Sequence, residues 1–387
     1  MKSTLPLATV QIQNFKAITD TNIIQFTPLT AIIGNNGSGK SSLIEALATF
    51  QMLVEGGLES AMQPWKGFEN IWNKSRTAIL NPSPNKAGVQ FFSPPMSFSI
   101  SGKMQHTYQA ETVISLNERK QVLFVHEHVI QSNVFKFARD AAGRLTKSRN
   151  TKADLPLKQV APDRSFFPMV YDCGISQWQF LALQPGRMGD LVYRRRTGGR
   201  VRLAADGSNL ADYLREFSEL DIPGFNAFVE AMQVVLPFAK DLRPVEVDSS
   251  WEKKIMLEMK EARFSVPAWL LSTGTLRIAS LLAVLRHPEP PPLIIVEEIE
   301  NGLDPRTIHL LVEEMRNVVE SGRSQIILTS HSPYLLDLLE LSQIIVVERD
   351  GTGAPQFKRP ADDRSLKDWR EKFSPGMLYT MGRLTKN

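Results

Sequence analysis

The first residues whose types and spacing could do chemistry form a glycine-rich segment in the N-terminal part of the chain. The segment comprises Gly34, Asn35, Asn36, Gly37, Ser38, Gly39, Lys40, Ser41 and Ser42. This spacing lets backbone N–H groups surround a phosphate, while Lys40 reaches the β- and γ-phosphate oxygens and Ser41 offers a hydroxyl to Mg²⁺. An apolar run at 29–33 predicts a strand before the segment, and apolar residues at helical spacing over 43–50 predict a helix after it. This context favours a phosphate-binding loop.

A second set of candidate catalytic residues follows two apolar runs in the C-terminal half. Glu297 and Glu298 come directly after the run at 293–296, and His331 follows the run at 325–328. Such runs are typical of parallel strands buried on both faces. In a nucleotide site, Glu297 would orient Mg²⁺ through water, Glu298 would be the general base, and His331 would hydrogen-bond the γ-phosphate.

A third candidate site lies at the start of a predicted helix. Ser272 and Gly274 precede apolar residues that recur at helical spacing from Leu276 to Leu285. A serine and a glycine at a helix start can bind an anion, and they are equally typical of an ordinary helix cap. The residues alone leave both interpretations open.

The elements that must position these residues fall into two patterns. Strand-like segments over 96–146 predict an antiparallel sheet, whereas the alternation of strands and a helix over 293–328 predicts an α/β layer. Helical periodicity appears at 209–217 and 225–235, and alternation over 254–264 predicts a strand.

Composition narrows the class of protein. The chain has 387 residues, of which 42% are hydrophobic and 22% charged, and this balance excludes a disordered or fibrous protein. The single cysteine, Cys173, cannot form an internal disulfide, which favours a reducing compartment. The N-terminus lacks an apolar signal core, and no stretch approaches the ~18 apolar residues of a membrane span. We therefore expect a soluble, cytoplasmic protein.

The net charge of +4 neither requires nor excludes a nucleic-acid partner. The densest basic run comprises Arg194, Arg195, Arg196, Arg200 and Arg202. This run could contact phosphates, but a solvated loop explains it equally simply. A loose match to a restriction-type metal pattern, Asp248 with Glu258–Lys260, is explained by strand alternation.

The order of the motifs resembles the ATP-binding-cassette (ABC) type of ATPase head, and within it the RecF, SMC and OLD-type AAA family ATPases. Ser272 and Gly274 match the signature motif, and the loop 301–305 matches the segment after the catalytic glutamate. The opening Ile12–Lys16 is also typical of this group, and the tail around Leu366–Trp369 is similar to a compact branch often encoded beside nucleases.

The resemblance implies an α/β fold of the P-loop NTPase class, with an antiparallel β lobe, a parallel-sheet α/β lobe and no coiled-coil arm. The whole of 1–387 would be a single head with approximate lobes at 1–200 and 201–387. It also implies ATP and Mg²⁺ as cofactors, with Asp304 at the nucleotide and a metal-binding glutamine. Gln184 and Gln179 are both candidates for that glutamine.

The resemblance further implies a homodimer in which two heads pair head to tail around ATP. Ser272 and Gly274 of one chain would close on the γ-phosphate bound to Lys40 of the other, and hydrolysis by Glu298 would reopen the dimer. Three residues depart from the family pattern: Glu297 replaces an aspartate, Ile299 a proline, and Asp304 the histidine frequent in the compact branch. These departures suggest slow turnover.

Several functions are compatible with these motifs. No heptads support the long arm of an SMC protein, and no Asp-x-Asp motif supports the TOPRIM nuclease of an OLD enzyme. We therefore expect an ATPase switch that controls a separate effector, such as a nuclease or toxin, in phage defence or DNA maintenance. The alternatives are a RecF-like DNA-binding repair ATPase, a slow-turnover ATP-dependent scaffold and, less in keeping with the opening motif, the soluble subunit of a membrane transporter.

Overall fold

The computed structural model describes residues 5–74, 94–117, 119–131, 135–139, 145–147, 161–167, 174–194, 199–248 and 253–384. Cys173, Arg195 and Arg196 lie outside these residues. The chain divides into two compact units: Met1–Trp178, Leu341–Leu366 and Thr385–Asn387 form the first, and Gln179–Glu340 and Lys367–Leu384 form the second. In the described ranges, no helix is both long enough and apolar enough to span a bilayer.

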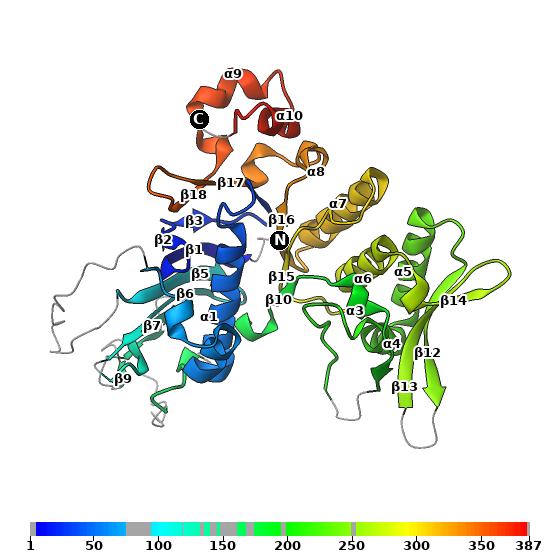
Figure 1. Ribbon diagram of the computed structural model, residues 1–387, viewed down its shortest axis with the longest axis horizontal. Coiled ribbons are helices and arrows are strands. Elements are labelled where there is room, and N and C mark those ends of the chain that lie inside the picture. Colours follow the sequence, from blue (N-terminus) through cyan, green and yellow to red (C-terminus); the bar gives the residue numbers. More distant parts are fainter. Residues whose placement is uncertain are drawn as a thin grey trace. The chain divides into compact units, whose positions relative to one another are not determined.

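The first unit contains an antiparallel sheet in the order β2, β1, β5, β6, β7, β8, β9, with β3 paired to β1 (Figure 1). Its strands are β1 (Leu5–Phe15), β2 (Ile18–Asp20), β3 (Ile24–Gln25), β5 (Met96–Lys103), β6 (Thr107–Leu116), β7 (Val122–Gln131), β8 (Phe135–Arg139) and β9 (Leu145–Lys147). Buried and less buried residues alternate along β5, as a sheet with one covered face requires. The antiparallel sheet expected over 96–146 is therefore confirmed for the described strands.

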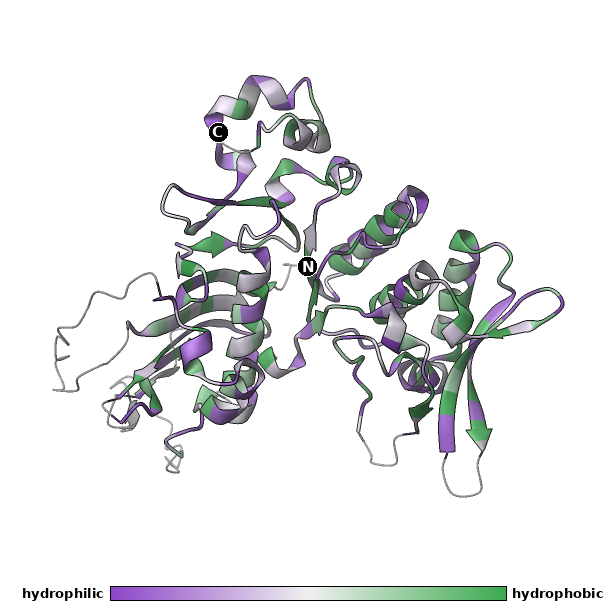
Figure 2. Ribbon diagram, viewed as in Figure 1, coloured by the Kyte–Doolittle hydropathy of each residue, from purple (hydrophilic) through white to green (hydrophobic). Residues whose placement is uncertain are grey.

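Helix α1 (Lys40–Met62) packs on this sheet, and the phosphate-loop segment joins it to β4 (Leu29–Ile33). The rings of Phe50 in α1 and Phe98 in β5 lie 5.8 Å apart, and Phe50 also meets Phe167 edge to face. Figure 2 shows hydrophobic and hydrophilic residues mixed along α1, in keeping with one buried face. The helix kinks at Gly57, where φ is 79°. Gly57 lies so close to Asp163 that an added Cβ would be 2.3 Å from the Asp163 carbonyl oxygen.

Strand β4 pairs in parallel with β17 (Ile344–Arg349), which pairs antiparallel with β18 (Pro355–Lys358). Every residue of β4 is buried. The remaining short 3₁₀ segments of this unit are η1 (Gln63–Trp65), η2 (Phe68–Asn70), η4 (Ile175–Gln177), η6 (Leu341–Gln343), η7 (Pro360–Asp362) and η8 (Arg364–Leu366).

The second unit contains three parallel strands, β10 (Gln179–Leu181), β15 (Leu293–Val296) and β16 (Gln325–Ser330). All residues of β15 and β16 are buried, as the apolar runs predicted. The helices of this part are α3 (Pro185–Met188), α6 (Thr273–Arg286), α7 (Pro305–Glu320), α8 (Pro333–Asp337), α9 (Lys367–Arg370) and α10 (Pro375–Thr380). The predicted α/β layer is therefore confirmed.

A small antiparallel sheet and two helices complete the second unit. Its elements are β11 (Val192–Tyr193), β12 (Asp241–Asp248), β13 (Lys253–Lys260), β14 (Ser265–Pro267), α4 (Leu210–Leu220), α5 (Ile222–Val235) and the 3₁₀ segment η5 (Ala268–Leu270). The prediction of a single strand over 254–264 is wrong, because β13 ends at Lys260. The N–H of Glu261 donates to the Phe264 carbonyl in a turn, and the chain returns as β14 beside β13.

Candidate functional site

The phosphate-loop segment of the first unit is built on glycines whose backbones allow close approach. Gly34 has φ 151°, and a Cβ there would lie 2.2 Å from the Val347 carbonyl oxygen of β17. Gly39 has φ 117°, and a Cβ there would lie 2.6 Å from Pro355 of β18. The hairpin β17–β18 therefore packs against the loop in a way that only glycine permits at these two positions.

Lys40 lies inside the loop, with only 7% of its surface exposed. Its ammonium group donates hydrogen bonds to the Gly34 carbonyl at 2.7 Å and to the Asn35 carbonyl at 3.1 Å. The Ser38 N–H closes the loop by donating to the Asn35 carbonyl at 3.1 Å. The ammonium group is thus placed at the centre of the loop, where a bound phosphate would meet it.

The first turn of α1 suits an anion. Its N-cap is Gly39 in the left-handed conformation, no described side chain caps the helix, and its first turn carries no acidic residue. The first backbone N–H groups of a helix have no partner within the helix, and the helix dipole favours negative charge there. Ser41 is exposed at this end, and a hydroxyl oxygen is a ligand that Mg²⁺ accepts.

Arg349, at the end of β17, supports the loop in a way that the sequence did not indicate. Its Nε donates to the Gly37 carbonyl at 2.7 Å, and its guanidinium group also donates to the Gly353 carbonyl at 2.7 Å. Arg349 and Gly37 are 312 residues apart in the chain. Because the acceptors are backbone carbonyls, no residue pattern signals this contact.

In the second unit, the candidate base Glu298 adopts an unusual backbone conformation. Its φ is 47°, in the left-handed region that is uncommon for residues other than glycine. Its N–H donates to the Thr329 hydroxyl at 2.8 Å, and the Asn301 side-chain amide donates to its carboxylate. Strained residues persist only where their surroundings hold them, and they cluster at functional sites. Glu298 is exposed, so its carboxylate is accessible.

Arg277 of α6 holds the backbone of this loop from within the unit. Its guanidinium group donates to the Leu183 carbonyl at 3.1 Å, the Glu297 carbonyl at 3.0 Å and the Glu298 carbonyl at 2.6 Å. Burial lowers the pKa of Arg277, while the nearby carboxylates of Glu298 and Glu300 oppose that shift. Arg277 belongs to none of the motifs in the sequence, although it lies three residues after Gly274.

His331 lies at the same edge of the parallel strands as the two glutamates. Val296 of β15 is the register partner of Leu328 of β16 in a parallel pair, so the two strands end at the same edge of the sheet. The backbone N–H of His331 donates to the Glu300 carboxylate, and the side chain of His331 is half-exposed. The predicted proximity of these strand ends is therefore present in the structure.

The two candidate glutamines have different surroundings. Gln179 is buried, and its amide donates to the Leu203 carbonyl at 2.9 Å and the Phe180 carbonyl at 3.1 Å. Gln184 is exposed and lies just beyond β10, where the N–H of Glu297 donates to the Leu181 carbonyl at 2.8 Å. Of the two, Gln184 is the one whose side chain remains accessible at the edge that carries Glu297.

The Ser272–Gly274 segment begins α6. The Ser272 hydroxyl oxygen accepts the Thr275 N–H at 3.0 Å, so Ser272 is a helix cap. A Cβ on Gly274 would lie 2.5 Å from the Gly302 carbonyl oxygen, so this glycine allows the loop after Glu298 to approach α6. The segment is therefore joined to the loop that carries the candidate base.

Asp304 caps α7. Its carboxylate accepts the Arg306 N–H at 2.9 Å and the Thr307 N–H at 3.3 Å. A hydrogen bond from the Thr307 hydroxyl is the main cause of its lowered pKa. The structure thus gives Asp304 a helix-capping role at the end of the loop after Glu298.

The described members of the basic run are mostly paired. Arg194 forms an ion pair of 2.5 Å with Glu246, and Arg200 forms one with Glu289. The residues of the restriction-type metal pattern lie at different positions along the β12–β13 hairpin. Asp248 is the register partner of Lys253, whereas Glu258 is the register partner of Arg243. Among the described residues, no group of three or more His, Cys, Asp or Glu side chains could hold a metal ion.

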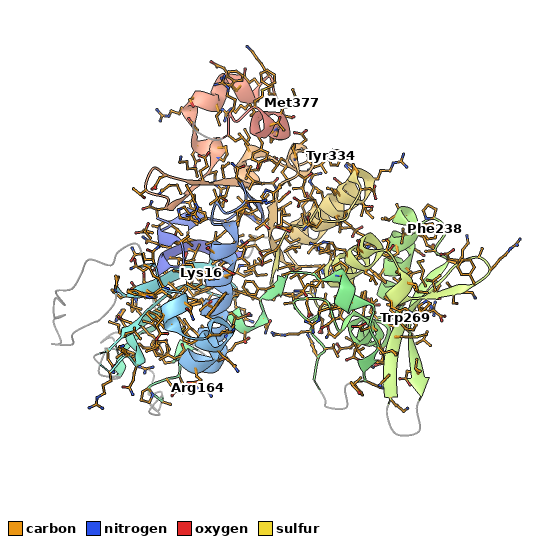
Figure 3. All side chains as sticks on the ribbon, in the orientation of Figure 1. Lys16, Arg164, Phe238, Trp269, Tyr334 and Met377 are labelled. Atoms are coloured by element: carbon orange, nitrogen blue, oxygen red, sulfur yellow. The ribbon has the colours of Figure 1, made fainter. Side chains whose placement is uncertain are left out.

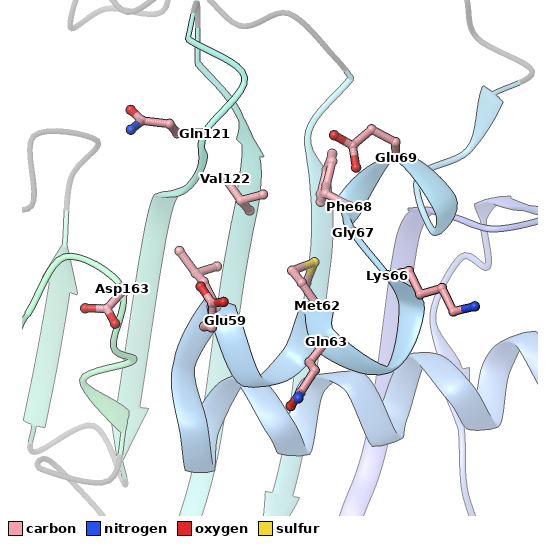
Figure 4. Close-up of a pocket in the computed structure, with 11 residues that line it drawn as sticks. Glu59, Met62, Gln63, Lys66, Gly67, Phe68, Glu69, Gln121, Val122 and Asp163 are labelled. Carbon is pink, nitrogen blue, oxygen red and sulfur yellow. The ribbon is translucent and has the colours of Figure 1, made fainter.

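A cavity of about 600 Å³ in the first unit involves none of the predicted site residues (Figure 4). It lies beside the C-terminal end of α1 and is lined by apolar side chains, including Met62 and Phe68, and by the acidic residues Glu59, Glu69 and Asp163. Lys66 also lines it. The candidate nucleotide-binding residues therefore do not coincide with this cavity.

Comparison with known proteins gives two matches to family models. Residues 6–81 match a model described as "AAA ATPase domain", and residues 189–337 match one described as "AAA domain, putative AbiEii toxin, Type IV TA system". The first range contains the phosphate loop, and the second contains the glutamates, His331 and the start of α6.

A curated relative and solved structures span more of the chain. An "ATP/GTP phosphatase" of Helicobacter pylori (strain ATCC 700392 / 26695) is 20% identical over 359 residues, which are 86% of this chain and 87% of that protein. An SMC head bound to the C-winged helix domain of ScpA is 16% identical, with a TM-score of 0.48 and coverage of 91% of this chain and 96% of that one. The SMC head domain from Thermotoga maritima is 14% identical, with a TM-score of 0.48 and coverage of 91% and 98%.

These findings confirm the predicted P-loop α/β fold class and the resemblance to RecF- and SMC-like AAA ATPases. The strand, glycine loop and helix are present, the two AAA models match the segments that carry the motifs, and the curated relative is a nucleotide phosphatase. The chain is therefore an ATPase whose two motif-bearing segments are similar to AAA ATPase domains.

Proposed function

We propose that this ATPase is a molecular switch that dimerises head to tail around ATP and controls a separate effector protein. The observation that carries the proposal is the connection between the start of α6 and the candidate base. Arg277 of α6 bonds the Glu298 carbonyl, and Gly274 meets the loop at Gly302. A γ-phosphate that is bound to a second chain and contacts Ser272 would therefore lie next to the contacts that hold Glu298.

Each chain would contribute two kinds of groups. The loop residues Gly34–Ser42 would bind the phosphates of ATP, with Lys40 on the β- and γ-phosphate oxygens. Glu298 would activate the attacking water, and His331 would hydrogen-bond the γ-phosphate. These groups have the donor and acceptor types that each step requires, and Glu298 and His331 follow neighbouring parallel strands.

Mg²⁺ is the proposed metal cofactor. The Ser41 hydroxyl, the Glu297 carboxylate and the Gln184 amide oxygen are hard oxygen ligands of the type that Mg²⁺ prefers. Bound Mg²⁺ would neutralise charge on the phosphates. The longer side chain of Glu297, where related ATPases carry aspartate, supports the proposal of slow turnover.

Exposed apolar side chains next to Ser272 support self-association. Trp269 (Figure 3) and Leu270 of η5 are 50% and 69% exposed, and they lie three and two residues before Ser272 in the chain. Exposed apolar patches favour protein contacts, and tryptophan is frequent among the residues that dominate interface energies. A second copy of the chain that closes on Ser272 would cover both side chains.

The proposed effector is a nuclease or toxin of a defence or DNA-maintenance system. The model matched over 189–337 is described for a toxin of a type IV system, and the tail is similar to ATPases encoded beside nucleases. DNA binding by the basic run is the weaker alternative, because Arg194 and Arg200 already pair with carboxylates.

Light scattering of Glu298→Gln with and without ATP and Mg²⁺ tests the switch. The variant keeps the shape of the base but loses its proton acceptor, so ATP should trap a dimer. Adding Ser272→Arg should abolish the ATP-dependent dimer. An assembly that forms fully without nucleotide, or that persists with Ser272→Arg, would contradict the proposal.

A matched control separates interface loss from helix-cap loss. Ser272→Arg removes a cap hydrogen bond, which costs about 1 kcal/mol. Asp221 caps α5 in the same way, by accepting the Gly224 N–H at 3.0 Å. Asp221→Arg in the Glu298→Gln background should therefore lower stability similarly while leaving the ATP-dependent dimer intact.

A further inference from the structure

We propose that Glu300 is a positioning residue for His331, and that the docking of α10 on α8 fixes the chain segment that follows this histidine. The inference rests on the proposed role of His331 at the γ-phosphate. It adds a residue and a C-terminal element that neither the motifs nor the proposed function includes.

Glu300 joins the loop of the candidate base to the histidine itself. One oxygen of its carboxylate accepts the backbone N–H of His331, which lies 31 residues later in the chain. The other oxygen, Oε2, is buried and has no hydrogen-bond partner in the described part of the chain. A hydrogen bond from N–H to a carboxylate is charge-assisted and roughly twice as strong as a neutral one. The backbone of His331 is therefore held by a single strong contact from Glu300.

Neighbouring contacts bind the same two segments together, but none of them reaches His331. The N–H of Glu298 donates to the Thr329 hydroxyl at 2.8 Å, and the N–H of Ile299 donates to the Thr329 carbonyl at 3.3 Å. These contacts hold the strand ends in place. Removing the Glu300 carboxylate should therefore free His331 locally without separating the strands.

Helix α10 fixes the segment after His331. The N–H of Gly376 donates to the Asp337 carboxylate of α8 at 2.6 Å. A Cβ on Gly376 would lie 2.1 Å from the carbonyl oxygen of Pro333, which lies two residues after His331. Only glycine allows this approach, so the docking of α10 depends on the backbone immediately after the histidine.

Helix α10 also carries a side chain, Tyr379, that interacts electrostatically with Glu300. Burial raises the pKa of Tyr379 in α10, and the Glu300 charge adds to that increase. On the outer surface, Tyr334 of α8 is 40% exposed and Met377 of α10 is 45% exposed (Figure 3). The C-terminal helix thus connects an exposed surface to the contacts that position His331.

The test compares steady-state ATP hydrolysis by wild type, Glu300→Ala, Glu300→Gln, His331→Ala and the Glu300→Ala/His331→Ala double variant. Misplacing a catalytic group by about 1 Å costs about 100-fold, so we expect kcat of Glu300→Ala to fall about 10- to 100-fold with KM changed less than about twofold. Glu300→Gln keeps an oxygen acceptor at the same position and should retain most of kcat. If Glu300 acts through His331, the double variant should be no slower than His331→Ala.

Gly376→Ala tests the second contact. The added methyl group must displace α10 or Pro333, so kcat should fall while ATP affinity and KM stay near those of wild type. The control is Gly351→Ala, where a methyl group would meet nothing within 4 Å and kcat should not change. Thermal unfolding of every variant shows whether the folded fraction accounts for any loss.

Each contrary result has a distinct meaning. Wild-type kcat in His331→Ala would contradict the proposed role of the histidine, and with it the proposed function at this residue. A slow His331→Ala beside a fully active Glu300→Ala would overturn the positioning role alone. Multiplicative losses in the double variant, or equal losses in Glu300→Gln and Glu300→Ala, would also overturn it. An unchanged kcat in Gly376→Ala would remove the contribution of α10.

Discussion

The contacts of the buried Arg277 guanidinium group allow the effect of replacing it on stability to be calculated. It is 5% exposed and donates to three backbone carbonyls, those of Leu183, Glu297 and Glu298. Removing the donor leaves three carbonyls without a partner, and each buried acceptor left unsatisfied costs about 1–3 kcal/mol. Arg277→Met should therefore lower the free energy of unfolding by about 3–5 kcal/mol.

The same substitution should slow catalysis by more than lost stability explains. Without the bond to its carbonyl, Glu298 can leave the left-handed conformation at φ 47° that now aims its side chain. We expect kcat to fall at least about tenfold with little change in KM, since only the group that we propose acts on the reacting water is displaced. Arg277→Lys keeps the charge but cannot bond all three carbonyls, so it should be intermediate.

Urea unfolding and ATP hydrolysis of the folded protein measure the two effects separately. Arg286 provides the control because it lies in the same helix and donates to the Ala227 carbonyl at 2.9 Å and to Glu314 at 3.1 Å. Arg286→Met should lower stability but leave kcat of the folded fraction unchanged. Equal losses of kcat in Arg277→Met and Arg286→Met, or full activity in Arg277→Met, would refute the reasoning.

Three further predictions follow from contacts elsewhere. Arg349→Met should raise KM for ATP severalfold while kcat changes little, because the phosphate loop loses a supporting hydrogen bond; steady-state kinetics with unchanged KM would contradict this. Trp269→Ala with Leu270→Ala should weaken the ATP-dependent dimer at least about tenfold in light scattering, whereas Phe238→Ala should not. Burial raises the pKa of Glu127 from 4.5 to about 7. Between these pH values the folded state therefore holds a proton on Glu127 that the unfolded state has released. Wild type should therefore lose stability as pH rises through this window, and urea unfolding at pH 5 and 8 should show a smaller loss for Glu127→Gln.

Local patterns predicted the parts of the site that depend on neighbouring residues. The phosphate loop and α1 follow from spacing within 29–50, and the strand ends with Glu298 and His331 follow from two apolar runs. Ser272 also has the helix-cap role that its local pattern allowed, since its side chain caps α6. Burial, which sequence does not show, distinguishes Gln184 from Gln179.

The supporting contacts could not be predicted because their acceptors are backbone groups far away in the chain. Arg277 bonds carbonyls 20, 21 and 94 residues away, and the partner of Arg349 is 312 residues away. The error at 254–264 has a different origin. The turn from Glu261 to Phe264 contains no glycine or proline, so alternation appeared to continue through it.

The central claim is that hydrolysis needs two chains, and the dependence of ATPase activity on protein concentration tests it most directly. Over the concentration range in which light scattering shows a monomer without nucleotide, the rate per chain should rise with concentration until the ATP-bound dimer is saturated. Ser272→Arg should remain slow at every concentration. A rate per chain that stays constant across that range, with Ser272→Arg as active as wild type, would contradict the account.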